Sequence, residues 1–179
     1  MTLSELLADF ARRIAELERR QDGIIKRGRV VEVDPESARV RLRLNEESAP
    51  EPFLSPWVPY AQIAGALKVH TPPSVDQQMV IISETGDLQQ GVAVPMTWSE
   101  RNEAPSKQGD EHVITFGSFK AVLKEKELIV SIGDVSVRIH EGGVAFSNGR
   151  VEHDGRNIGK DHIHGGVEPG PANTDVPAN

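Results

Sequence analysis

Residues 128–146 read Leu-Ile-Val-Ser-Ile-Gly-Asp-Val-Ser-Val-Arg-Ile-His-Glu-Gly-Gly-Val-Ala-Phe. Apolar side chains alternate with other residues in three short runs, which are separated by Gly133-Asp134 and Gly142-Gly143. This period of two predicts β-strands with one apolar face, and the glycine pairs predict the turns. The apolar positions are Leu128, Val130 and Ile132, then Val135, Val137 and Ile139, then Val144 and Phe146, after an earlier run at Val113 and Thr115.

Repeat units of about 8 to 11 residues are too short to bury such a face within one chain. Stacking or intertwining with copies of the same chain would bury it. The alternative is an antiparallel meander formed by a single chain and packed on a neighbouring domain.

Composition also favours an oligomer. Only 37% of the 179 residues are apolar and 4% are aromatic, whereas 16 glycines and 12 prolines suit turns and narrow β-structure. The buried area that one copy can form is therefore modest, and association would increase it. A net charge of -7 is unfavourable for binding phosphate backbones, so nucleic acid is not an expected partner.

Membrane and secretion signals are not evident in the sequence. No run approaches the roughly 20 apolar residues of a membrane span, and residues 1–5 lack a basic, apolar leader, so synthesis in the cytoplasm is expected. Because the chain has no cysteine, a bound metal must use histidine, carboxylate or backbone oxygen.

The N-terminal segment predicts a helix from a Ser4 N-cap to Gly23. Its apolar residues follow a spacing of 4, 3, 4 and 3, as in a coiled coil. These residues are Leu3, Leu7, Phe10, Ile14 and Leu17. Two heptads are short for a free coiled coil, so a small trimeric collar and a helix packed on the next domain both stay open.

The next stretch, from Ile24 to Trp98, contains five short β-like runs. Asp34-Pro35-Glu36-Ser37 predicts the first hairpin turn. Five strands in about 75 residues fit an OB-type barrel, which hosts many functions and identifies none alone. The predicted strands are Arg29–Val33, Ala38–Leu44, Phe53–Tyr60, Met79–Ser83 and Val92–Thr97.

The C-terminal region contains His162-Ile163-His164. In an extended strand, residues two apart face the same side, so both imidazoles point in one direction. Two ligands per chain are too few for a tight site, but three chains supply six, which suits an octahedral first-row ion such as iron, nickel or cobalt. Such a saturated site is structural, since no position is open for a substrate. On spacing alone, two surface histidines without a metal remain the alternative.

The sequence from Asp161 to Pro177, with its His-Ile-His-Gly-Gly-Val, Pro-Gly and Asn-Thr elements, resembles the baseplate assembly protein V family. These proteins are the central tail spikes of contractile-tailed phages and R-type pyocins, with relatives at the tip of type VI secretion systems. The resemblance implies a mainly β homotrimer, with a short N-terminal helix, an OB-fold collar, an intertwined triple-stranded β-helix and a metal-bound apex.

That resemblance also implies one iron per trimer, held by six nitrogens from His162 and His164 of each chain. It implies a membrane-piercing structural protein rather than an enzyme, assembled at the baseplate tip of a virion or pyocin. Its partners would be the tail hub, the baseplate proteins and the host outer membrane. No metal role is expected for His70, His112, His140 and His153. The expected domains are helix 1–23, collar 24–100, linker 101–111, shaft 112–152 and apex 153–179.

Two functions of other classes compete with a spike. A His-x-His pair begins the zinc motif of metallo-β-lactamases, but Gly165 and Gly166 follow it here in place of an Asp-His pair. An OB-fold oligonucleotide binder would need stacking aromatics in a basic groove, whereas Phe53, Trp57 and Tyr60 are interrupted by prolines in an acidic chain.

Overall fold

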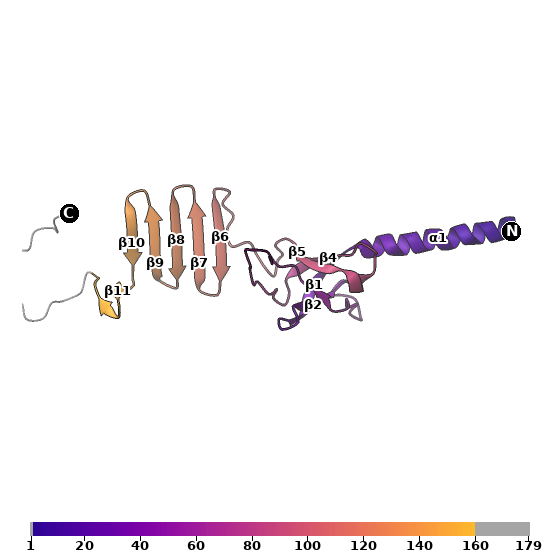
Figure 1. Cartoon of the computed structure of the whole chain (residues 1–179), viewed down its shortest axis with the longest axis horizontal. Helices are drawn as coiled ribbons and strands as arrows, with labels where there is room; N and C mark the ends of the chain where they lie inside the picture. Colours follow the sequence, from indigo (N-terminus) through magenta and orange to yellow (C-terminus); the bar gives the residue numbers. More distant parts are fainter. Residues whose placement is uncertain (1, 160–179) are drawn as a thin grey trace, which may run out of the picture. The chain divides into compact units, whose positions relative to one another are not determined.

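The computed structural model describes residues 2–159 (Figure 1). The chain divides into a first unit that ends at Ala104 and a second that begins at Pro105. The first unit contains α1 (Leu3–Ile24), β1 (Ile25–Asp34), β2 (Arg39–Arg43), β3 (Val58–Pro59), β4 (Gln78–Ile82), the 3-10 turn η1 (Leu88–Gln90) and β5 (Val92–Pro95). Within the described residues, no helix has the length and apolar character of a membrane span.

Helix α1 begins two residues earlier than predicted. Its N-cap is Thr2 and not Ser4: the Thr2 hydroxyl accepts a hydrogen bond from the Glu5 amide at 3.3 Å. The Glu5 carboxylate in turn accepts one from the Thr2 amide at 2.7 Å. This capping box requires a glutamate three residues after the cap, and only Thr2 has one at that distance.

At its C-terminus, α1 continues directly into β1 without a loop. Gly23 is buried there, and a side chain on it would overlap the Gly86 carbonyl. Gly86 has a φ of +76°, and a side chain on it would overlap the Arg20 backbone. Gly23 and Gly86 are both required at this junction because the backbone segments are in direct contact and leave no room for a side chain. The apolar stripe of α1 remains exposed, so the helix is not packed on the barrel along its length.

The barrel strands are ordered β3-β2-β1-β4-β5, and all their neighbours are antiparallel. A bridge between Tyr60 and Ala93 joins the two outer strands, and the Ala61 amide donates to the Ala93 carbonyl at 2.8 Å. These contacts nearly close the sheet into the predicted five-stranded OB-type barrel. A bulge between Val30 and Glu32 bends β1, the central strand.

The core of the first unit lies inside this barrel. Ser55 and Ser83 are also buried, and their hydroxyls donate to the carbonyls of Pro56 and Asp87, both at 2.7 Å. Within the described residues, the buried Tyr60 hydroxyl has no hydrogen-bond partner. The buried apolar cluster is Val30, Val40, Leu42, Val58, Tyr60, Met79, Ile81 and Ala93.

The second unit is a five-stranded antiparallel meander in the order β10-β9-β8-β7-β6 (Figure 1). Its strands are β6 (Glu111–Phe116), β7 (Phe119–Lys124), β8 (Glu127–Ile132), β9 (Val135–His140) and β10 (Gly143–Ser147). Strand β7 was not among the predicted runs. The short hairpin β11 (Glu152–His153) and β12 (Arg156–Asn157) follows, and its turn residues Asp154 and Gly155 both have positive φ, as a tight two-residue hairpin requires.

Each meander strand pairs with its neighbour in sequence, so the ladders lie within one chain. The intertwined triple-stranded β-helix that the resemblance implied involves further copies of the chain and stays a prediction. The predicted mainly β architecture, with an N-terminal helix, a small barrel and a repetitive β-region, is confirmed.

Candidate functional site

The hydrogen-bond register assigns every meander residue to one of two faces. Directly paired residues share a face, and successive residues of a strand alternate between faces. One cross-strand row consists of Ile114, Ala121, Val130, Val137 and Phe146. The face with this row, here called the apolar face, consists of His112, Ile114, Phe116, Phe119, Ala121, Leu123, Leu128, Val130, Ile132, Val135, Val137, Ile139, Val144 and Phe146.

Thirteen of these fourteen residues are apolar, yet the apolar face is open to solvent in the described chain. Eight of its side chains are between 47% and 86% exposed, with Phe116 the most exposed. Burying a side chain of this kind stabilises a protein by about 1.5–3 kcal/mol. Because the eight side chains are already partly buried, covering what remains exposed would contribute roughly 7–14 kcal/mol of hydrophobic stabilisation. An exposed apolar surface of this size indicates an interaction site.

The opposite face is polar apart from one apolar row around Val122, which is only 8% exposed. Two ion pairs cross strands on this face. Lys124 lies 3.5 Å from Glu111, and Arg138 lies 2.6 Å from Glu127. With polar side chains on one face and apolar ones on the other, the sheet has one face suited to solvent and one that is stable only when buried against another surface.

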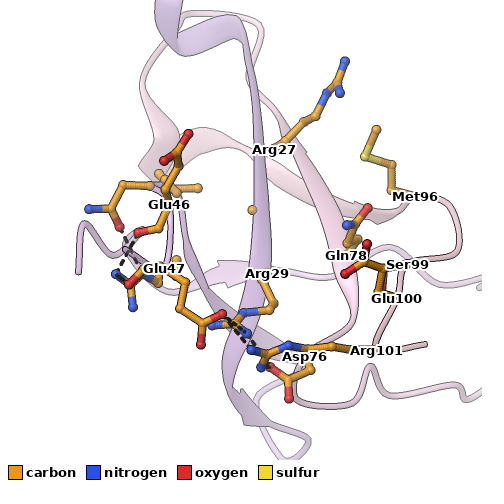
Figure 2. Close-up of a pocket in the computed structure, with 14 residues that line it drawn as sticks. Arg27, Arg29, Glu46, Glu47, Asp76, Gln78, Met96, Ser99, Glu100 and Arg101 are labelled. Carbon is orange, nitrogen blue, oxygen red and sulfur yellow. Dashed lines mark hydrogen bonds and ion pairs between the residues drawn. The ribbon is translucent and has the colours of Figure 1, made fainter. Parts of the chain in front are cut away.

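The first unit has a groove of about 680 Å³ beside β1 (Figure 2). In it, the guanidinium groups of Arg29 and Arg101 alternate with the carboxylates of Glu47 and Asp76. Arg101 lies 2.6 Å from Glu47 and 3.2 Å from Asp76. Arg29 lies 3.4 Å from Glu47 and 3.1 Å from Asp76. We call these four residues the charged ring.

The charged ring fastens the segment after β5 to the barrel. Arg101 belongs to that segment, and the Asn102 side chain donates to the Asp76 carbonyl at 3.0 Å. The hydrogen bond from Arg101 is the main cause that lowers the pKa of Glu47, and Glu47 in turn raises the pKa of Arg101. The groove is lined by four arginines and four carboxylates and by no aromatic residue, so its charges balance.

The predicted metal ligands, His162 and His164, lie outside the described residues. Within residues 2–159, no three histidine, cysteine or carboxylate side chains are grouped as metal ligands would be. His112 lies on the apolar face, whereas His140 accepts a hydrogen bond from the Gly142 amide at 3.1 Å. His153 is exposed, with Asp154 3.6 Å away.

Two family models match the chain. Residues 26–98 match the injector OB domain of type VI secretion systems and phage baseplates. Residues 160–178 match the GpV apex motif. The chain belongs to the phage baseplate V family. No curated protein sequence matches it well enough to count as a relative.

The phage baseplate V family consists of structural spike proteins and not enzymes, which removes the metallohydrolase alternative. Members are components of the baseplate at the tail tip and therefore have baseplate partners. The matched OB domain covers β1 to β5, including the charged ring except Arg101. The apex motif spans the two predicted ligands, His162 and His164.

Sequence reasoning missed part of the apolar face. The register places the predicted run at Val113 and Thr115 on the opposite face, and the apolar face instead has Ile114 and Phe116 of β6. It also adds the β7 residues Phe119, Ala121 and Leu123. Turn residues on either side of β7, at Gly117-Ser118 and Glu125-Lys126, were the available signal.

Proposed function

We propose that this protein is the membrane-piercing spike of a contractile phage tail or pyocin and that it works as a homotrimer. The observation that carries the proposal is the uncovered apolar face of the second unit. Three copies would turn their apolar faces toward a common axis, so that each chain forms one wall of a shaft and presents its polar face to water. In this form the expected triple-stranded shaft needs no exchange of strands between chains.

The OB barrel would act as the collar that seats in the tail hub, and contraction of the sheath would drive the shaft into the host outer membrane. At the apex, His162 and His164 of each chain would supply six imidazole nitrogens to one iron. The position of both histidines inside the matched apex motif supports this assignment. A filled coordination sphere would join three chain ends and couple tip folding to metal binding.

No specific observation favours an oligonucleotide binder. Single-stranded nucleic acid requires a positive groove with aromatic side chains for stacking. The barrel groove has balanced charge and no aromatic lining.

The trimer is tested with two neighbouring residues on β9 that face opposite sides. Val137 lies in the middle row of the apolar face, and Ser136 lies on the polar face. Val137→Asp would place a charge at the buried axis, which is costly without a partner, and should convert the trimer to monomers or aggregates in sedimentation. Ser136→Asp should remain trimeric. A monomeric wild-type protein, or equal behaviour of both variants, would contradict the trimer.

The metal is tested separately. Elemental analysis of the purified protein should find about one iron per three chains, from the six-ligand site. His162→Ala combined with His164→Ala should remove the iron while the shaft stays trimeric. A wild-type trimer that contains no metal would refute the iron tip. A double variant whose C-terminus resists protease as well as that of the wild type would also refute it.

A further inference from the structure

The apolar stripe of α1 is the second large uncovered surface of the chain. Gly23 is the only buried residue of this helix within the described chain. A helix with one apolar side normally packs that side against something, because packing supplies most of its stability in water. The stripe residues are Leu3, Leu7, Phe10, Ile14 and Leu17, which are 49% to 72% exposed.

The stripe has coiled-coil geometry. Its spacing places Leu7 and Ile14 at a positions and Leu3, Phe10 and Leu17 at d positions of a heptad. The flanking positions that decide orientation are then Ser4, Ala11 and Glu18 at e, and Leu6, Arg13 and Arg20 at g.

The ion pairs of α1 leave one flanking carboxylate unused. Asp9 lies 3.0 Å from Arg13, and Glu16 lies 2.7 Å from Arg20. Glu18 forms no hydrogen bond or ion pair in the part of the chain that the structure describes. Its e position is on the border of the stripe, where a residue of a neighbouring helix would lie.

Charge decides between the two possible orientations of neighbouring helices. In a parallel, in-register coiled coil, a g residue faces the e residue five positions further along the neighbouring helix. That rule brings Arg13 opposite Glu18 of the neighbouring copy. In an antiparallel pair, g faces g, so Arg13 and Arg20 would meet arginines and repel.

We propose that α1 of three copies forms a parallel, in-register coiled coil in which Arg13 of each chain pairs with Glu18 of the neighbouring copy. The number three rests on the proposed trimer of the shaft. Fewer than three heptads are marginal in isolation. Copies already joined by their apolar sheet faces have an effective concentration on the order of millimolar, which makes the short coiled coil feasible.

Single cysteines test the geometry, because the sequence contains none. Leu3→Cys and Leu17→Cys introduce thiols at opposite ends of the stripe, and Arg12→Cys introduces one on the outer side of the helix. On oxidation, the first two variants should each form covalent dimers within the trimer, since a d position meets its own equivalent only in a parallel, in-register arrangement. Arg12→Cys should not.

Charge reversal tests the ion pair in the Leu17→Cys background. Arg13→Glu and Glu18→Arg should each slow the linking by about threefold or more, and the double variant should restore it. Arg12→Glu, which changes the same charge on the outer side, should have little effect.

The outcomes separate this inference from the proposed function. The protein could sediment as a trimer and yet form no disulfides in Leu3→Cys and Leu17→Cys, or form them equally in Arg12→Cys. Either result would overturn the coiled coil but not the trimer of the shaft. Charge variants that fail to compensate would overturn the Arg13–Glu18 pair. A monomeric wild-type protein would overturn both proposals.

Discussion

Two arginines of the barrel groove differ in what they contact. Arg101 bonds both carboxylates of the charged ring, whereas Arg27 lines the same groove and forms no hydrogen bond or ion pair within the described residues (Figure 2). Substituting each arginine in turn therefore distinguishes the loss of the Arg101 ion pairs from the mere loss of one positive charge in the groove.

Arg101→Met should loosen the segment at residues 99–102 because it breaks two ion pairs that hold this segment on the barrel. Amide exchange at Asn102, whose N–H donates to the Ser99 carbonyl at 3.1 Å, should accelerate by roughly tenfold at most, as exposed pairs are weak. Arg27→Met is the control and should leave that exchange unchanged. Equal exchange in both variants would show that the charged ring does not hold the segment.

At the scale of elements, the junction between α1 and β1 depends on two glycines in backbone contact. Gly23→Ala should lower the free energy of unfolding by about 2 kcal/mol or more, because the added methyl group overlaps the Gly86 carbonyl and the backbone must move. Gly65→Ala is a matched control: nothing lies within 4 Å of its added carbon. Urea unfolding measures both variants, and similar midpoints would refute the account of this junction.

Most elements of the fold were predictable from local pattern, and the exceptions have physical reasons. The helix and four of the barrel strands follow from period and turn residues, whereas the predicted strand Phe53–Tyr60 contains only the two-residue β3. Strand β7 was missed because Val122 adds an apolar residue on the polar face, so Ala121, Val122 and Leu123 obscure the alternation. The helix cap was misplaced because Ser4 and Thr2 are both good caps. The hydrogen bond from the Thr2 amide to the Glu5 carboxylate decides between them.

At the scale of the whole molecule, acid should weaken the fold through four carboxyl groups with lowered pKa values. They are Glu16, lowered to about 2, and Asp34, Glu47 and Glu111, hydrogen-bonded chiefly by Arg19, Ser37, Arg101 and Ser106 respectively. Their pKa values in the unfolded chain are higher, so their stabilising contribution is complete above about pH 5 and is lost as pH falls toward 2.

The urea midpoint should accordingly decline from pH 5 to pH 2.5. Glu47→Gln should make the decline shallower, whereas Glu100→Gln should not, because Glu100 lines the same groove without a hydrogen bond or ion pair in the described chain. A midpoint that stays level over this range would refute the contribution of these groups.

The candidate site was predictable only in part. Alternation at Leu128, Val130 and Ile132 indicated one apolar face, but its full extent required the register of five strands, which depends on turn lengths. The roles of His162 and His164 stay a prediction, because they rest on the family motif and lie outside the described residues.

The pairing of each meander strand with its sequence neighbour also affects how the protein folds. Contacts between adjacent strands are local in sequence, and chains rich in local contacts cross their folding barrier quickly. The sheet of the second unit should therefore form within a single chain before any encounter with another copy. Assembly would then be the slow, concentration-dependent step, and during that interval the newly made sheet would be prone to aggregate.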